Sequence, residues 1–296
     1  LVPPEQRAEA FGLMYSLLNL GFAVAGVAGG FIAEYSFTWL FWGDGITTGL
    51  YGLVILLFIS ETSATSPQHD ENQDSSTEES ETSSEATQAA EVPFFEAMKR
   101  VASDHAYMIF LLAGFLGSIV FMQGETTLPL HMKSEGISSR TYGLLISVNG
   151  LMIVLFQVPI AHGLRGFNSM KVIILGTAVM GVGFVINAFA TEFLLFGLSI
   201  VVWTIGEMIQ SPFCSKVIND LAPPELRARY MAPFSMSFSA ALMVGAPLGG
   251  RVLTAYGPQI LWLSCGGLIL IAVILQTTIL TSVTARTNSE KEPESA

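Results

Sequence analysis

The chain has 296 residues, of which 51% are hydrophobic and 12% are charged, whereas charged residues make up roughly 25% of a typical soluble domain. This composition excludes an ordinary soluble globular protein, because the apolar surface is more than one soluble core can bury, and it indicates that lipid solvates most of the surface. The net charge of −11 is a local feature, since residues 61–96 contain ten acids and no Lys or Arg.

Eight apolar runs along the chain are each long enough to cross a bilayer as a helix, which takes about 20 residues. We predict helices over residues 10–33, 37–59, 106–130, 141–162, 171–189, 193–217, 229–254 and 259–283. The runs lack the alternation of a membrane β-barrel, and an open sheet in lipid would leave backbone groups without hydrogen-bond partners. The predicted fold class is therefore an all-α membrane protein, with short connections between antiparallel helices.

A Ser-, Thr- and Glu-rich stretch divides these helices into two groups. We assign residues 1–60 to the first two helices, 61–104 to a disordered acidic cytoplasmic linker, 105–285 to a six-helix bundle and 286–296 to a cytoplasmic tail. Residues 92–103, at the end of the linker, have an amphipathic pattern, and we expect them to lie along the membrane surface.

The distribution of basic residues predicts the orientation in the membrane. Ten of them flank one side of the predicted helices and three flank the other, which places both termini and the linker in the cytoplasm. The ten are Arg7, Lys99, Arg100, Arg165, Lys171, Lys216, Arg227, Arg229, Arg286 and Lys291, and the three are Lys133, Arg140 and Arg251. The first residue is Leu1 rather than Met, and we expect further sequence before it.

The opening of the chain is repeated near its end. PPEQRA at Pro3 aligns with PPELRA at Pro223, and with the same shift the Gly-Gly pair at 29–30 falls on the pair at 249–250. Each copy is a charged loop followed by a helix rich in small residues, a pattern typical of closely packed membrane helices. Duplicated halves indicate a secondary transporter.

These motifs resemble the major facilitator superfamily, whose members have twelve helices in two six-helix halves joined by a long cytoplasmic loop. The opening PPEQRAEAFGLMYSLLNLG is similar to the family's loop and fifth helix, and GEMIQSPFCSKVINDLAPPELRARYM, from Gly206, is similar to its tenth helix and the loop that follows. QGETTLPLHM, from Gln123, and NGLMIVLFQVP, from Asn149, are similar to bacterial exporters of the multidrug-resistance type. The resemblance covers the whole chain and implies that it corresponds to helices five to twelve.

The resemblance implies a major facilitator-like helical bundle with two helices of the N-terminal half and the six-helix C-terminal half. It implies a multi-pass protein of the plasma (inner) membrane that exports small amphipathic or drug-like molecules, coupled to protons, by alternating access. The alternatives are a metabolite importer or uniporter of the same superfamily and a non-transporting, truncated membrane protein. Drug antiporters carry a Gly-Pro-x-x-Gly-Gly kink in the fifth helix, and residues 25–30 depart from this pattern because they contain no proline.

The sequence lacks the motifs of an ATP-driven or enzymatic protein. Neither GxGxxG nor GxxxxGK[ST] occurs between a strand and a helix, and we find no nucleophile elbow, zinc-ligand spacing or nucleic-acid patch. We therefore expect no catalytic residue, no metal and no cofactor. The expected partners are a small-molecule substrate and the lipid bilayer, without nucleic acid, and we expect a monomer.

Three acids inside predicted helices are candidates for proton coupling, because an ionisable side chain at membrane depth costs a few kcal/mol. Glu207 lies near the midplane and either couples protons or makes a structural hydrogen bond to a neighbouring helix. Glu125 lies towards the outer end of its helix, just before a kinking Pro129, and either gates a cavity or reaches the interface. Asp44 either hydrogen-bonds to another helix or takes part in coupling.

Polar and aromatic residues at helical spacing predict a pocket for an amphipathic ligand, with interhelical packing as the alternative. The candidates for this pocket are Asn19, Gln123, Tyr142, Asn149, Phe156, Gln157, Trp203, Gln210 and Ser211. The repeated loops contain the candidate gating-loop residues Arg7, Arg227 and Arg229. His105, His131 and His162 lie at predicted helix ends, where we expect interfacial or solvated positions.

Overall fold

The computed structural model describes residues 7–58 and 93–289, and the side chains of residues 17–57 and 93–286. All secondary structure in these ranges is helical, which confirms the predicted all-α class. The elements are α1 (Arg7–Tyr35), α2 (Phe37–Phe58), α3 (Phe94–Ser103), α4 (His105–Thr126), α5 (Leu128–Ser134), α6 (Ser139–Leu164), α7 (Ser169–Ile186), η2 (Asn187–Phe189), α8 (Phe193–Leu221), η3 (Pro224–Leu226), α9 (Arg227–Thr278) and α10 (Leu280–Ser289).

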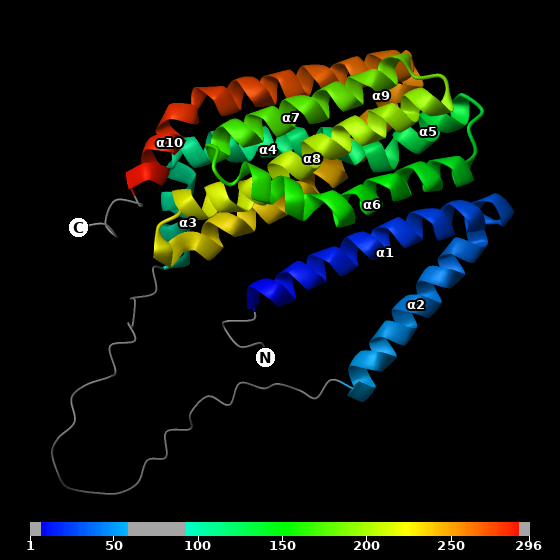
Figure 1. The fold of residues 1–296 in the computed structure, drawn as a ribbon, viewed down its shortest axis with the longest axis horizontal. Coiled ribbons are helices and arrows are strands. Elements are labelled where there is room, and N and C mark those ends of the chain that lie inside the picture. The colour runs from blue at the N-terminus through cyan, green and yellow to red at the C-terminus, as the bar shows by residue number, and fades with distance from the viewer. Residues whose placement is uncertain (1–6, 59–92, 290–296) are drawn as a thin grey trace, which may run out of the picture.

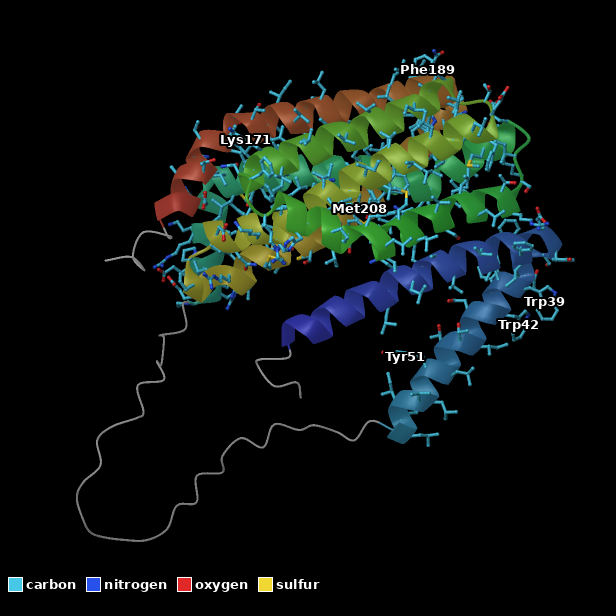
Figure 2. All side chains as sticks on the ribbon, viewed as in Figure 1. Trp39, Trp42, Tyr51, Lys171, Phe189 and Met208 are labelled. Atoms are coloured by element: carbon cyan, nitrogen blue, oxygen red, sulfur yellow. The ribbon has the colours of Figure 1, made fainter. Side chains whose placement is uncertain are left out.

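Helices α4 to α9 form a bundle along the long axis of the molecule, and α1 lies along one side of it against α6 (Figure 1). From its junction with α1, α2 diverges away from the bundle. The short helices α3 and α10 lie at the same end of the bundle, which we call the α10 end. Figure 2 shows Lys171 towards this end and Phe189 at the opposite one.

Seven helical segments of the described chain are long and apolar enough to cross a membrane. One of them, Pro224–Arg286, has 63 residues, about three times what a single crossing needs. Gly257 breaks α9 inside this segment with a φ of 85°, a left-handed conformation that glycine adopts without steric cost, and Pro258 follows. α9 is therefore a hairpin whose second arm returns to the α10 end (Figure 1). The predicted span 229–254 is its first arm, and the predicted span 259–283 covers its second arm and the start of α10.

Side-chain caps explain where three of the helices begin. Asp104, Ser138 and Asn168 each accept a hydrogen bond from the backbone N–H three residues later, at 3.1 to 3.2 Å, and so start α4, α6 and α7. Pro129 lies in the first turn of α5, which is separated from α4 at Thr127, as expected for a proline that cannot continue a helix.

The structure corrects the predicted extent of the disordered linker. Residues 94–103 form the helix α3, which buries Ala97 and Val101 against the bundle and exposes Phe94 and Phe95. Its amphipathic pattern provides the apolar face that orders it, and the opposite face carries an ion pair between Arg100 and Glu96 at 2.7 Å. The remainder of the predicted linker, residues 59–92, lies outside the described residues.

Two hydrophobic clusters fill the bundle, one towards each end. The cluster at the α10 end includes Tyr107, Phe213 and Tyr230, and the cluster at the opposite end includes Phe184 and Trp262. The outer surface is also apolar, and Trp39, Trp42 and Tyr51 project from α2 (Figure 2). An apolar exterior around a packed interior is expected of helices that face lipid.

Small residues allow α1 and α6 to approach each other closely. Ser147 Oγ donates to the carbonyl oxygen of Ala23 at 2.7 Å, and a Cβ added at Gly143 would overlap the carbonyl oxygen of Gly26. The two glycines of the second repeated pair, Gly249 and Gly250, differ in how closely they pack. A Cβ at Gly249 would overlap Gln123 on α4, whereas a Cβ at Gly250 would meet no atom of the described residues within 4 Å.

Candidate functional site

Two cavities, one inside the bundle and one between the bundle and α1, share part of their walls. The larger has a volume of about 270 Å³ and lies between α4, α7, α8 and α9, and we call it the aromatic cavity because four phenylalanines line it. The smaller has a volume of about 150 Å³ and lies between α1, α4, α6 and α8, and we call it the carboxylate cavity because Glu125 and Glu207 line it. Glu207 and Phe121 line both cavities.

Glu207 on α8 is held by Asn149 on α6. Asn149 Nδ2 donates to Glu207 Oε2 at 3.0 Å and to Thr204 Oγ1 at 3.0 Å. The Thr204 hydroxyl gives its own proton to the carbonyl oxygen of Ile200 at 2.6 Å, so its oxygen is available to accept from Asn149. The amide orientation is thereby fixed, and Asn149 presents a donor to the carboxyl of Glu207.

Glu125 lines the carboxylate cavity from α4, and Asn19 lines it from α1. The side chain of Glu125 is exposed, whereas Glu207 is partly buried. Two carboxyl groups and two amides around so small a space offer oxygen ligands and negative charge to a proton or a cation.

Trp203 lines the carboxylate cavity together with the aromatic residues Phe22 and Phe121. Its ring stacks on Phe184, with centroids 5.5 Å apart and planes 18° apart, and it meets the edge of Phe121 at 5.6 Å. Trp203 Nε1 is buried and has no hydrogen-bond partner among the described residues. A buried indole N–H usually has a hydrogen-bond partner, so this group departs from the common pattern.

A chain of polar side chains crosses the wall of the aromatic cavity. Gln276 Nε2 on α9 donates to Thr177 Oγ1 on α7 at 3.2 Å, and Thr177 donates to Gln210 Oε1 on α8 at 2.8 Å. The sequence-based candidates include Gln210 but omit Thr177 and Gln276. The signal that could have found them is a polar residue within an otherwise apolar predicted span.

Seven of the predicted site residues line the two cavities. Asn19, Glu125, Asn149, Trp203 and Glu207 line the carboxylate cavity, and Glu207, Gln210 and Ser211 line the aromatic cavity.

Four predicted pocket residues line neither cavity. Gln123 Nε2 donates to Gly245 O, and Gln157 Nε2 to Met208 O, each at 3.0 Å. Tyr142 Oη donates to Gly124 O at 3.1 Å. Phe156 is 49% exposed. Gln123, Gln157 and Tyr142 thus each bond to the backbone of a neighbouring helix. This is the interhelical packing that the sequence left open as the alternative to a pocket.

Three of the remaining candidates, Asp44, Arg227 and Arg229, line neither cavity. Asp44 is exposed on α2, the helix that diverges from the bundle. Arg227 is exposed, and the guanidinium of Arg229 lies 5.1 Å from the ring centre of Phe94 on α3. The side chain of Arg7 lies outside the described residues.

We expected an interfacial or solvated position for His131, but its side chain is buried and only 2% exposed. It lies in α5, beyond the end of the membrane-spanning segment His105–Thr126, and its Nδ1 accepts a hydrogen bond from Trp262 Nε1 at 3.0 Å. Burial lowers the pKa of His131, and Glu135, 3.9 Å from Nε2, opposes this shift. The neutral imidazole therefore joins α5 to the second arm of α9.

Two further hollows, of about 450 Å³ between α1 and α2 and about 440 Å³ between α1 and α6, are not lined by carboxyl or amide side chains. Among the described residues, no group of three or more His, Cys, Asp or Glu side chains could hold a metal ion. The two internal cavities are thus where charged and polar groups converge.

Comparison with known proteins identifies relatives along the whole chain. The profile described as Major Facilitator Superfamily matches residues 1–161 and again residues 125–296. The chain is 29% identical over 280 residues to the uncharacterized MFS-type transporter YttB of Bacillus subtilis, covering 94% of this chain and 65% of that protein.

Two further relatives show the same partial coverage. The chain is 24% identical over 273 residues to the uncharacterized MFS-type transporter YdeE of Escherichia coli, covering 91% of this chain and 63% of that protein. It is 23% identical over 265 residues to a Na(+), Li(+), K(+)/H(+) antiporter of Planococcus maritimus, covering 84% and 60%. The chain thus spans 60 to 65% of the length of these relatives.

Proposed function

The chain belongs to the Major Facilitator Superfamily, and from this premise we propose that the protein is a secondary active transporter that exports small amphipathic molecules in exchange for protons. The observation that carries the proposal is the position of Glu207, an acid in a membrane-spanning helix that lines both internal cavities. An ionisable side chain at membrane depth is costly and marks an ion or substrate pathway.

The composition of the aromatic cavity supports an amphipathic substrate. Its walls combine phenylalanine rings with the hydroxyl groups of Ser118 and Ser211 and the amide of Gln210. A mainly apolar wall with a few polar groups is typical of small-molecule sites, and aromatic rings also attract organic cations.

The shared wall supports coupling between the two cavities. When Glu207 is ionised it attracts a cationic group in the aromatic cavity, and when it is protonated this attraction is lost. A proton and a cationic substrate would then each weaken the binding of the other. Such negative coupling is what an exchanger requires, because release of one ligand must accompany binding of the other.

The contact between α1 and α6 supports a moving boundary. α1 precedes residues 59–92, α6 follows them, and the two helices meet through small residues such as Gly143 and Gly26. We propose that residues 1–60 and 105–285 belong to two bundles that rock about this contact during alternating access.

The orientation that we propose places the α10 end in the cytoplasm of a cell with a plasma (inner) membrane. Lys171 lies towards this end, as do α3 with Arg100 and α10 with Arg286 (Figures 1 and 2). Basic residues accumulate on the cytoplasmic side of membrane proteins. We also propose that the protein acts as a monomer and is not an enzyme.

A second candidate function is exchange of a monovalent cation for protons. The carboxylate cavity favours it, because Glu125 and Glu207 share a space of about 150 Å³ with the amides of Asn19 and Asn149. Oxygen ligands of this kind suit hard cations. One relative carries the name Na(+), Li(+), K(+)/H(+) antiporter.

Reconstitution of the full-length protein into proteoliposomes tests both functions. An imposed pH gradient should drive accumulation of ethidium, an aromatic cation, and collapse of the gradient should stop it. Proton movement driven by Na⁺ or K⁺ without ethidium accumulation would favour the second candidate. Substrate movement that ignores the pH gradient would indicate a uniporter, and no movement of any solute would contradict transport.

A further inference from the structure

We infer that the aromatic cavity contains a hydrogen-bonding subsite, centred on Gln276, that selects ligands with an N–H or O–H donor on a planar apolar body. The inference rests on the proposed function in one respect, which is that the bound ligand is a transported substrate. It deepens that function by assigning selectivity to Gln276 and Thr177, which the sequence pattern did not single out.

The first observation is an unmade hydrogen bond at the cavity wall. Gln276 lines the aromatic cavity and is only 4% exposed, and its Oε1 has no hydrogen-bond partner among the described residues. A buried amide oxygen without a partner is unfavourable, so it binds a donor strongly when one becomes available. Oε1 itself has less than 1 Å² of accessible surface, so a ligand in the cavity supplies that donor when the amide shifts towards it.

The second observation is that hydrogen bonds within the protein engage the amide nitrogen of Gln276 and leave its amide oxygen to bind a ligand. Thr177 gives its hydroxyl proton to Gln210 Oε1 at 2.8 Å, so its oxygen can accept from Gln276 Nε2 at 3.2 Å. The amide nitrogen of Gln276 is thus committed to Thr177. The remaining oxygen only accepts hydrogen bonds, and the subsite therefore distinguishes ligands with a donor from ligands without one.

The third observation concerns the shape of the ligand body. Phe110 and Phe234 stack with ring centroids 6.4 Å apart and planes 30° apart, and Phe121 and Phe238 lie 6.2 Å apart at 45°. All four rings line the same cavity as Gln276. Ring faces and edges favour a flat aromatic body, because aromatic pairs gain from stacking beyond the area that they bury.

Gln157 provides a matched comparison inside the same chain. Its Nε2 also donates to a neighbouring helix, at Met208 O, and its Oε1 also has no partner among the described residues. Gln157 lines neither the aromatic nor the carboxylate cavity. Loss of Gln157 therefore reports the general effect of removing a buried glutamine, without an effect on a ligand.

Binding of two dyes to the full-length protein in nanodiscs tests the inference. Thionine and methylene blue share a planar phenothiazinium cation, but thionine carries primary amino groups whereas the amino groups of methylene blue are fully methylated and have no N–H. Affinities are measured by equilibrium dialysis without a pH gradient, for the wild type and for Gln276→Met, Gln157→Met, Thr177→Val and Thr177→Ser.

We expect Gln276→Met to weaken thionine binding about three- to tenfold, the effect of one hydrogen bond, and to change methylene blue binding less than twofold. Thr177→Val should weaken thionine binding in the same selective way, because it frees the Gln276 amide to rotate. Thr177→Ser, which keeps the hydroxyl, should restore it. Gln157→Met should leave the ratio of the two affinities unchanged.

Equal losses for both dyes in Gln276→Met, an unchanged thionine affinity, or no detectable thionine binding to the wild type would each overturn the inference. If Gln276→Met does not fold, the Thr177→Val and Thr177→Ser pair decides between the same outcomes. Selective binding without pH-driven transport would support the subsite and contradict the proposed function. Transport of ethidium driven by a pH gradient without selective thionine binding would support the proposed function and contradict the subsite.

Discussion

Asn149 Nδ2 lies 3.0 Å from Glu207 Oε2 and joins α6 to α8 through a hydrogen bond to a carboxyl group inside the membrane-spanning part of the bundle. Only one carboxyl oxygen is engaged in this bond, so it is compatible with both the ionised and the protonated side chain. Glu207 can therefore be held in place while it exchanges a proton.

Replacement of Glu207 by Gln should separate coupling from structure. The amide keeps the size of the side chain and an oxygen that can accept from Asn149, but it cannot titrate. We expect the variant to insert normally and to lose at least tenfold in ethidium accumulation driven by a pH gradient in proteoliposomes.

Asp44→Asn is the matched control, because this acid is exposed on α2, away from both cavities. It should retain wild-type accumulation. Gradient-driven transport at the wild-type level in Glu207→Gln would assign Glu207 a purely structural role.

The repeated glycine pair should respond unequally to substitution. Gly249 packs against Gln123, which is buried and bonded to Gly245 O, so Gly249→Leu should force α4 and α9 apart and destabilise the protein by about 1–3 kcal/mol or more. Gly250→Leu places its side chain in open space and should change stability by less than about 0.5 kcal/mol. Thermal unfolding of the two variants in detergent measures the difference, and equal melting temperatures would contradict the packing.

Stability should fall in mild acid because of His131. Burial lowers its pKa in the folded protein, whereas the unfolded chain has a pKa of about 6.5, so the folded state binds fewer protons. The stabilisation by the neutral imidazole is fully present above about pH 6.5 and is lost as the pH falls through the lower folded value. Protonation of Nδ1 also removes the acceptor for Trp262. We expect the melting temperature to decrease between pH 7.5 and pH 5.

His131→Asn should flatten this dependence, since its side-chain oxygen can accept a hydrogen bond but does not titrate in this range. Wild-type and variant curves that fall in parallel would show that another group controls acid stability.

Asp104 should matter more for stability than its partner Arg286. Asp104 accepts from Tyr107 N at 3.2 Å, from Tyr230 Oη at 3.2 Å and from Arg286 Nη1 at 2.7 Å, and so joins α4, α9 and α10. Asp104→Ala removes a helix cap and leaves the Tyr230 hydroxyl without its acceptor, which should cost about 2 kcal/mol.

Arg286→Gln should cost no more than about 1 kcal/mol, because the Arg286 side chain is 45% exposed and solvent screens the pair. Thermal unfolding at low and high salt compares the two variants. A larger loss in Arg286→Gln than in Asp104→Ala would show that the ion pair, rather than the cap, holds this end of the bundle.

The sequence by itself determined the all-α class and the approximate positions of the spanning helices, because lipid forces each spanning segment to be apolar, helical and about 20 residues long. It also placed the hairpin of α9, since Gly257 and Pro258 interrupt an otherwise continuous apolar run. Glu207 was identifiable for the same reason, as an acid that an apolar helix does not carry without a role.

Only the tertiary structure decided which polar side chains face a cavity and which bond to a neighbouring helix. Gln123 and Gln276 are both buried amides in apolar helices. Gln123 bonds to the backbone of α9, whereas Gln276 lines the aromatic cavity and its oxygen has no partner among the described residues. Adjacent residues of a helix point about 100° apart, so Gly249 can touch α4 while Gly250 touches nothing nearby. The rotation of each helix is set by contacts with helices distant in the sequence, and a local pattern of polar and small residues does not encode it.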